Sequence, residues 1–300
     1  MKPKEITGDT KDKAIEIESL KNLLQRNFTK IENISLGHIS AGIPTSFNDF
    51  DAMTQGLRRG DLIAFAGRPS MGKTSLALQF ARNIAGQNLP VCFFGFDLSK
   101  EELAYRILGM EVGIEIGRIR TGRFTSEEWQ IVQEKNKKLE SLPIFIEDKK
   151  AISIDEIKNR CRNISMTNNE NGLGLIIIDS YQLMEYSNLD DYQSSLEKNT
   201  RELKTLAKEL NVPVLITAPI SRRVEERENC RPMLSDIRDS DVLEDYGDII
   251  VMLYRDEYYD PDTEDRGIAE LIVTTHRNGP VGTVKMLFEP QFGRYRNLAA

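Results

Sequence analysis

The chain has 300 residues, of which 40% are hydrophobic and 29% charged, enough for one large domain or two ordinary ones. Its net charge of −7 argues against a protein that coats nucleic acid, although a local basic patch is compatible with it. Three widely spaced cysteines and two histidines argue against a zinc site or disulfide scaffold, and no stretch is long enough to span a membrane, so we expect a soluble cytoplasmic protein.

An amphipathic pattern comes first. Residues 12–35 carry apolar side chains at steps of three and four, the spacing of one helix face. These are Ile17, Leu20, Leu24, Phe28, Ile31 and Ile34. The turn-like segment GHISAGIPTSF follows and ends the helix. The pattern fits a helix packed on its own domain, and equally an arm that docks on a neighbouring subunit. We place the domain boundary between residues 35 and 36.

From residue 60 onward, short apolar runs alternate with helix-like segments. The expected strands are 62–66, 91–97, 143–148, 173–179 and 212–218, and the expected helices are 73–86, 99–110, 153–165 and 194–210. Three later strand-like runs, 248–254, 269–275 and 283–289, are spaced closely enough to pair antiparallel. The sequence therefore predicts an α/β fold whose mostly parallel sheet is extended at one edge by antiparallel strands.

The strand-like run LIAFA leads into GRPSMGKTS, residues 67–75. This stretch fits the P-loop template G-x-x-x-x-G-K-[ST], in which backbone N–H groups and a helix N-terminus converge on phosphate oxygens. Lys73 is expected to bridge the β- and γ-phosphates, and Thr74 to hold Mg²⁺. The predicted ATP-binding residues are Gly67, Arg68, Pro69, Ser70, Met71, Gly72, Lys73, Thr74 and Ser75.

Acidic side chains end two other strand-like runs. LGLIIIDS ends in Asp179, which is expected to support the magnesium shell, the alternative being a turn cap. FFGFDLS contains Asp97, our candidate for the catalytic base or water-orienting residue; the alternative is a cap on the next helix, which Ser99 can provide. Tyr254 and Arg255 either lie beside the adenine or, for the tyrosine, belong to the core.

Together these motifs resemble a known family. The stretches that carry the resemblance are GIPTSFNDFDAMTQGLRRGDLIAFAGRPSMGKTSLAL, FFGFDLSKEEL, LIIIDSYQLM, LKTLAKELNVPVL, RPMLSDIRDSDVLEDYGDIIVMLYRDEYYDPDTEDRGIAELIV and HRNGPVGTV. In order and spacing, over about residues 36–297, they are similar to the C-terminal ATPase domain of bacterial DnaB-type replicative helicases. The first helix resembles the family's linker helix, which docks on the adjacent subunit. We expect the globular domain that precedes the linker in the family, and engages primase, to be missing.

The resemblance implies a RecA-like fold assembled as a hexameric ring, with single-stranded DNA in the centre and ATP between subunits. Arg277 in HRNGP matches the family's arginine finger, a cation worth ~10³–10⁵ in rate in other NTPases, unless it is a solvated turn residue. We assign DNA contact to Arg238 and Arg222. Expected partners are single-stranded DNA, further copies of the chain, and a helicase loader or a full-length helicase.

Four positions depart from the family's pattern. Asp97 stands where the family usually has Glu; its stem is one methylene shorter, and a displacement of ~1 Å can cost ~10²-fold. Ala218-Pro219 replaces a Ser-Gln pair whose amide senses the γ-phosphate and passes its state to the DNA-binding loop. Proline has neither a side-chain amide nor a backbone N–H, so we expect that relay to be absent or rerouted.

The other two departures remove or reverse charge. Thr275 replaces a Lys two residues before the finger, so one of two cations that act in trans is lost, and the intervening His276 compensates in part only if it is protonated. Asp239 and Asp241 replace Glu and Gly in the loop that approaches the DNA phosphates. Residues 221–241 contain five arginines and six acids, which makes a weak electrostatic funnel for DNA.

These observations leave three hypotheses. The first is an ATP-hydrolysing DNA helicase or translocase of the DnaB type that acts on single-stranded DNA in replication. The second is a divergent paralogue that binds ATP and assembles but unwinds weakly or not at all, and so has an assembly or regulatory role. The third is another RecA-like ATPase of the recombinase or clock type. The four departures favour the second hypothesis, and the length and order of the match favour the first.

Overall fold

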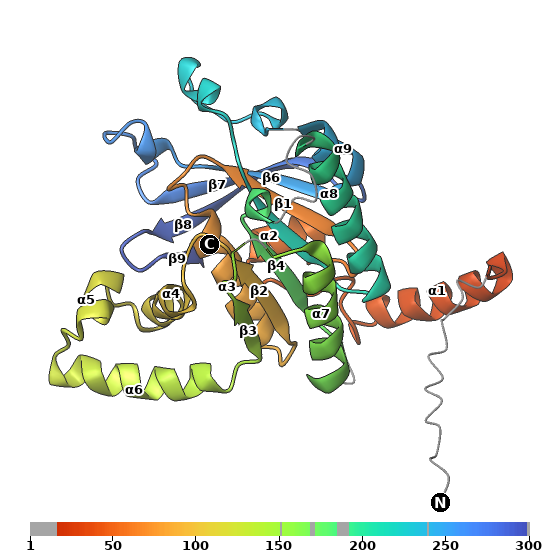
Figure 1. The fold of residues 1–300 in the computed structure, drawn as a ribbon, viewed down its shortest axis with the longest axis horizontal. Helices are drawn as coiled ribbons and strands as arrows, with labels where there is room; N and C mark the ends of the chain where they lie inside the picture. The colour runs from red at the N-terminus through yellow and green to blue at the C-terminus, as the bar shows by residue number, and fades with distance from the viewer. Residues whose placement is uncertain (1–16, 151, 169–171, 185–191, 239, 299–300) are drawn as a thin grey trace, which may run out of the picture. The chain divides into compact units, whose positions relative to one another are not determined.

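The computed structural model describes residues 17–150, 152–168, 172–184, 192–238 and 240–298 (Figure 1). The chain divides into two units, Met1–Ala41 and Gly42–Ala300. The beginning of the predicted first helix, residues 12–16, lies outside the described residues, and so does Asp239.

The first unit contains helix α1 (Leu20–Ser35). It begins at Ser19, whose hydroxyl accepts a hydrogen bond from the backbone N–H of Asn22 at 3.3 Å, as expected of an N-cap. The predicted helix is therefore confirmed over this range. Its apolar side chains, spaced to share one face, are 58–71% exposed: Leu20, Leu24, Phe28 and Ile31.

The second unit is built on a single sheet in the described part of the chain. Its strands are β1 Leu62–Gly67, β2 Val91–Gly95, β3 Ile144–Glu147, β4 Leu175–Asp179, β5 Val214–Pro219, β6 Ile249–Tyr254, β7 Ile268–His276, β8 Gly282–Glu289 and β9 Arg294–Asn297. The order across the sheet is β3-β2-β4-β5-β1-β6-β7-β8-β9. The strands from β3 to β6 are parallel, whereas β7, β8 and β9 are added antiparallel. The predicted fold class is confirmed, with β9 as an unpredicted last strand.

Helices cover both faces of this sheet (Figure 1). They are α2 Asn48–Thr54, α3 Lys73–Ala85, α4 Lys100–Val112, α5 Ile116–Thr121, α6 Ser126–Glu140, α7 Ile154–Asn168, α8 Tyr192–Glu209 and α9 Ser240–Tyr246, with short 3₁₀ helices η1 Tyr181–Leu183, η2 Arg222–Glu226, η3 Leu234–Asp236 and η4 Asp256–Tyr258. Residues of α2, α3 and α4 belong to the core on one face, and residues of α7, α8 and α9 to the core on the other. The structure adds α2, α5, α6 and α9 to the predicted helices. None of the helices in these ranges is long and apolar enough to cross a membrane.

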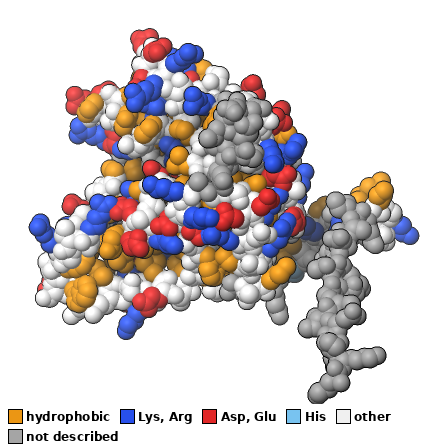
Figure 2. All heavy atoms as spheres, viewed as in Figure 1, with side chains coloured by type: hydrophobic (Ala, Val, Ile, Leu, Met, Phe, Trp, Pro, Cys, Tyr) orange, Lys and Arg blue, Asp and Glu red, His pale blue; other side chains and the backbone are white. Residues whose placement is uncertain are grey.

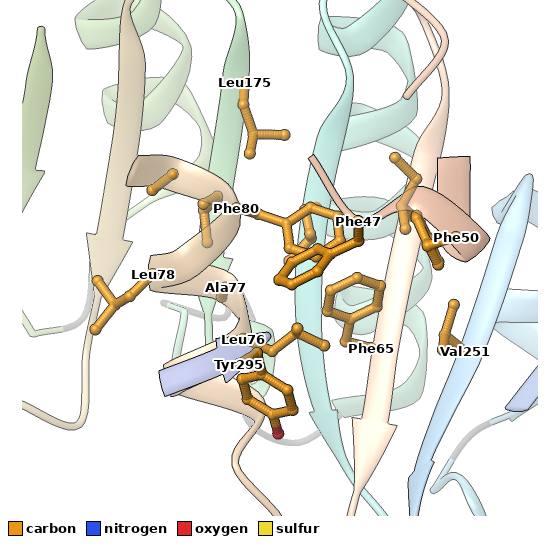
Figure 3. Packing of buried hydrophobic residues seen from close by; sticks show 14 of the residues in the cluster. Phe47, Phe50, Phe65, Leu76, Ala77, Leu78, Phe80, Leu175, Val251 and Tyr295 are labelled. Carbon is orange, nitrogen blue, oxygen red and sulfur yellow. The ribbon is translucent and has the colours of Figure 1, made fainter. Parts of the chain in front are cut away.

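An aromatic cluster fixes the centre of the fold (Figure 3). The ring of Phe80 on α3 meets those of Phe65 on β1 and Phe50 on α2 edge-on, with centroids 5.2 and 5.5 Å apart. All three side chains are fully buried. Edge-to-face pairs contribute about 0.5–1.5 kcal/mol beyond the burial of their area. This packing holds α3 against β1, the two elements that the P-loop connects.

Candidate active site

The P-loop connects the end of β1 to the start of α3, at the carboxyl edge of the parallel strands, where open α/β sheets bind their ligands. Gly72 has a φ of 99°, a conformation that favours glycine. A Cβ at this position would overlap the hydroxyl oxygen of Tyr295. Both the backbone and the packing therefore require glycine here.

A cavity of about 610 Å³ opens beside the loop, a size typical of small-molecule sites. Its lining residues are Pro69, Ser70, Gly72, Lys73, Thr74, Ser75, Asp97, Leu98, Arg106, Asp179, Ser180, Gln182, Leu183, Pro219, Arg255, Phe288 and Pro290. The structure thus brings both predicted carboxylates to the predicted lysine and threonine. Gly67, Arg68 and Met71 belong to the loop but do not line this cavity.

Lys73 is held inside the loop that it follows. Its Nζ donates to the backbone carbonyls of Gly67 at 2.8 Å and Arg68 at 3.0 Å. Burial lowers the pKa of Lys73 to about 8; the Asp179 carboxylate opposes this shift, and the nearby Arg68 guanidinium adds to it. The ammonium is thus largely protonated at neutral pH and available to a phosphate.

Asp179 ends β4 as predicted and is buried. Its Oδ2 accepts from the Thr74 hydroxyl at 2.7 Å, and its Oδ1 accepts from the Thr217 hydroxyl on β5. Burial raises the pKa of Asp179, and these two hydrogen bonds oppose the shift. A carboxylate beside a threonine hydroxyl is an oxygen donor set that suits Mg²⁺, which is usually bound by one or two carboxylates together with substrate phosphates. The residues therefore fit the metal.

Asp97 lies just beyond β2, lines the cavity and is exposed. It makes no hydrogen bond or ion pair with any residue that the structure describes. The capping alternative fails, because Ser99 performs that role: its hydroxyl accepts from the N–H of Glu102 at 3.2 Å at the start of α4. Asp97 is thus a carboxylate available to whatever occupies the cavity.

Tyr254 and Arg255, at the end of β6, have side chains in different surroundings. Arg255 lines the cavity, donates to the Ser70 carbonyl at 3.2 Å, and lies 4.7 Å over the ring of Phe288. Tyr254 is buried and bonds instead to Asp256 at 2.6 Å. Arg255 therefore faces the site, and Tyr254 belongs to the core.

Tyr295 on β9 supports the P-loop from beneath and was missed by the sequence analysis. Its hydroxyl lies 3.2 Å from the Met71 carbonyl and 3.3 Å from that of Gly72. The ring packs on Phe288 with centroids 4.4 Å apart, and burial raises the pKa of the phenol. Because β9 was not predicted, no sequence signal pointed to this contact.

Arg277 lies away from the cavity of its own chain. Its guanidinium donates to carbonyls at the end of α9, including Gly247 at 2.9 Å and Glu244 at 3.2 Å, as cations do at helix C-termini. The preceding residue, His276, pairs with Ile249 at the start of β6, whereas the P-loop follows the end of the neighbouring parallel strand, about 13 Å further along. Arg277 therefore does not reach the P-loop of its own chain in this arrangement.

His276 points into its own turn. Its Nδ1 lies 3.0 Å from the Pro280 carbonyl, and a Cβ on Gly279 would overlap the ring. The suggested compensation for the missing lysine at position 275 would need this ring to leave its turn.

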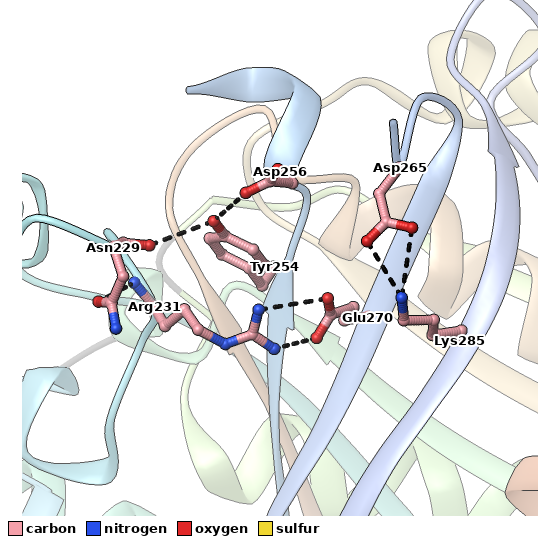
Figure 4. A network of polar contacts seen from close by, with 7 residues as sticks. All are labelled: Asn229, Arg231, Tyr254, Asp256, Asp265, Glu270 and Lys285. Carbon is pink, nitrogen blue, oxygen red and sulfur yellow. Dashed lines mark hydrogen bonds and ion pairs between the residues drawn. The ribbon is translucent and has the colours of Figure 1, made fainter. Parts of the chain in front are cut away.

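Residues 221–238 form the candidate nucleic-acid interface. Arg231 forms a bidentate pair with Glu270 and lies 4.8 Å over the ring of Tyr254 (Figure 4), and Arg227 pairs with Asp236 at 2.9 Å. The arginines left exposed, with no ion pair to any described residue, are Arg222, Arg223 and Arg238. These ion pairs neutralise acids as well as arginines. The number of charged residues in the sequence 221–241 therefore does not measure the charge that the segment presents.

The surroundings of this segment are mixed in charge. Figure 2 shows basic and acidic side chains interspersed on the face of the α/β unit that it displays. A second cavity, of about 460 Å³, has Arg223 and Arg238 among its lining residues. Asp241 lies in the first turn of α9, where an acid is favourable. Pro219, at the end of β5, borders both cavities.

Comparison with known proteins adds the following. A model of the DnaB-like helicase C-terminal domain matches residues 42–297. The replicative DNA helicase DnaC of Bacillus subtilis (strain 168) is 40% identical over 286 residues, and the replicative DNA helicase DnaB of Geobacillus stearothermophilus is likewise 40% identical. Each match covers 94% of this chain and 62% of the relative, so the chain spans less than two thirds of these curated relatives.

Two solved structures have the same fold. One is an isolated ATPase domain, which superposes with a TM-score of 0.89 and 34% identity, covering 95% of this chain and all of that one. The other is a DnaB-like replicative helicase, studied with its interactions with primase, which gives a TM-score of 0.85 and 34% identity over 95% of this chain and 68% of that chain.

Proposed function

Because the chain belongs to the DnaB-like helicase C-terminal domain family, we propose that it is an ATP-driven motor that moves along single-stranded DNA and unwinds DNA in replication. The observation that carries the proposal is a single cavity lined by Lys73, Thr74, Asp97 and Asp179. The names of the relatives, replicative DNA helicases, support the choice of DNA as the track.

In this proposal the P-loop amides and Lys73 bind the triphosphate, and Asp97 orients the attacking water from the open side of the cavity. Thr74 and Asp179 hold Mg²⁺, which neutralises charge on the phosphate oxygens when it is bound. Arg255 and Phe288 line the same cavity, with Arg255 bonded to the Ser70 carbonyl, and we assign them contact with the nucleoside.

The motor is proposed to be a homo-oligomer, a hexameric ring in the simplest form. Arg277 supports this, because in the isolated chain it lies at the opposite end of the strands from the P-loop. We propose that it acts on the nucleotide of the neighbouring copy. Residues 1–35 serve as a linker that docks on that neighbour, residues 36–300 form the ATPase domain, and the exposed apolar side chains of α1 support this division.

DNA contact is proposed for Arg238 and Arg222, which the structure leaves exposed and unpaired among the described residues. Guanidinium groups of this kind bind phosphate oxygens without reading sequence. A helicase loader or a full-length helicase is the proposed protein partner.

A second candidate is an assembly or regulatory paralogue that binds ATP without productive turnover. Two observations favour it. Pro219 borders both cavities and has no side-chain amide, and the ring of His276 is held against the Pro280 carbonyl in its own turn. This candidate predicts ATP binding and oligomerisation without DNA-stimulated hydrolysis.

Steady-state ATP hydrolysis, with and without single-stranded DNA, separates the two. Lys73→Ala is the blank, because it removes the ammonium that the loop carbonyls hold. Turnover that DNA stimulates several-fold, and that the blank lacks, supports the motor. Strong ATP binding with turnover equal to the blank supports the paralogue and rules out the motor.

A further inference from the structure

Arg68, the second residue of the P-loop, makes its contacts outside the nucleotide cavity. It does not line the cavity, and only 11% of its side chain is exposed. Its Nε donates to Oε1 of Glu225 at 2.8 Å, and its Nη1 donates to the backbone carbonyl of Ile220 at 3.3 Å. Both acceptors belong to the segment that follows β5, so this side chain ties the P-loop to the candidate nucleic-acid interface.

From Ile220 the contacts continue without a gap. Ile220 forms an antiparallel bridge with Ile237, and the N–H of Ser221 donates to the Asp236 carbonyl at 2.7 Å. Arg238, a proposed DNA contact, comes directly after Ile237. A displacement of residue 68 therefore reaches Arg238 through two hydrogen-bonded steps.

The backbone of Arg68 touches the group expected to respond to nucleotide. Its carbonyl accepts from Lys73 Nζ at 3.0 Å, alongside the carbonyl of Gly67. In the proposed function a bound phosphate competes with these carbonyls for the Lys73 ammonium. A lysine that turns to the phosphate releases the peptide of Arg68, and a lysine that returns restores the bond. Such a choice between two discrete arrangements is what energetic coupling between sites requires.

We propose that Arg68 is a positioning residue that couples nucleotide occupancy of the P-loop to the placement of Arg238, through Ile220 and Glu225. The inference rests on the proposed function, since it assumes that residues 221–238 bind DNA. Of the two outcomes expected at Pro219, a relay that is absent or one that is rerouted, it corresponds to the second; Pro219 borders both cavities but carries no side-chain amide.

The test uses Glu225→Gln in the full chain. Glutamine keeps the shape of the side chain and removes the charge that holds Arg68, without touching the cavity. Glu226→Gln is the matched control, because it makes the same change one residue away in η2, on an exposed acid with no ion pair among the described residues. The probe is a fluorescent oligothymidylate, titrated with and without a non-hydrolysable ATP analogue.

The measured quantity is the ratio of the two DNA dissociation constants, together with the fold-stimulation of ATP hydrolysis by the same oligonucleotide. Coupling free energies between sites usually correspond to about 5–150-fold in affinity. We expect Glu225→Gln to bring the ratio towards one, a loss of about fivefold or more. The thermal unfolding midpoint of each variant is the control for a general loss of structure. Glu226→Gln should leave the ratio of the two DNA dissociation constants at the wild-type value.

A charge swap distinguishes loss of the ion pair from misfolding of the single variant. Arg68→Glu combined with Glu225→Arg restores the ion pair with its two charges exchanged. This double variant should recover part of the coupling that Arg68→Glu alone loses. Full wild-type coupling in Glu225→Gln overturns the inference and leaves the proposed function standing. A wild-type protein whose DNA affinity and turnover ignore the partner ligand overturns the proposed function, and the inference with it.

Discussion

The nucleotide cavity and the 221–238 segment lie next to each other and are built differently. Around the cavity, Lys73, Asp179 and Thr217 are buried or nearly so and already hydrogen-bonded to one another or to the P-loop. In the segment, the arginines with buried acidic partners are structural, and Arg238 is exposed without a partner among the described residues. One region is preorganised within a single chain, whereas the proposed DNA contact in the other has no partner among the described residues.

The cavity is therefore the region whose polar contacts a single chain completes by itself. Preorganised donors gain their effect without rearrangement at the moment of reaction, which is the usual source of catalytic power. An exposed arginine contributes to binding affinity only when it contacts a phosphate, and salt weakens that contribution. Four experiments test this contrast.

The largest effect is expected at Arg277. Arg277→Ala should lower DNA-stimulated turnover about 10³-fold, because a finger acts on charge that develops only in the transition state. ATP affinity should change little. Mixing this variant with Lys73→Ala should restore activity, since some interfaces then combine an intact P-loop with an intact finger from the neighbour. Absence of recovery in mixed rings whose thermal stability is normal would contradict action in trans.

Asp97 is next. Asp97→Asn should lower turnover about 10²-fold or more, because the amide cannot accept a proton or orient water as a carboxylate does. Asp97→Glu keeps the charge and lengthens the stem, and should retain most of the activity. Single-turnover hydrolysis in excess enzyme measures both variants without interference from product release. Unchanged turnover in Asp97→Asn would remove this residue from the mechanism.

The lowered pKa of Lys73 predicts that ATP affinity depends on pH and that DNA affinity does not. Burial holds its pKa at about 8, below that of a free lysine, and the protonated form binds phosphate. Binding above this pKa must take up a proton, so affinity falls as the pH rises, by about tenfold between pH 7.5 and 9. Affinity measured without divalent cations should follow this course. In Lys73→Arg the dependence should vanish, because arginine stays charged. DNA affinity, which we attribute to arginines, should not change in the same buffers.

The smallest effect is expected on the DNA side. Arg238→Ala should weaken binding of single-stranded DNA a few-fold and reduce the salt slope by about one. Arg123→Ala, an exposed arginine between α5 and α6, is the control and should leave the slope unchanged. An unaltered slope in Arg238→Ala would move the DNA path elsewhere.

Sequence reasoning reached the residues whose chemistry depends on local order. Lys73 and Thr74 lie in one contiguous loop, and Asp97 and Asp179 follow strands whose apolar runs are easy to recognise. Because parallel strands end at one edge, those carboxylates had to converge near the loop. The capping role of Ser99 followed from its place before a helical pattern.

Other features depend on contacts between distant segments. The pairing of Arg231 with Glu270 joins a loop to β7, and no count of charges in residues 221–241 reveals it. Arg106 and Phe288 line the cavity from positions that lie outside the motifs recognised in the sequence. The strand β9 is only four residues long and polar in part, so its pattern is too short to detect.

The contact between Tyr295 and the Met71 carbonyl also bears on how the protein is made. The two residues are 224 positions apart. At about 5–20 residues per second, a ribosome needs roughly 10 to 45 s to travel from one to the other. Throughout that interval the nascent chain contains the P-loop but lacks Tyr295, whose hydroxyl contacts the carbonyls of Met71 and Gly72. The P-loop is therefore complete in sequence long before its packing partner on β9 is synthesised.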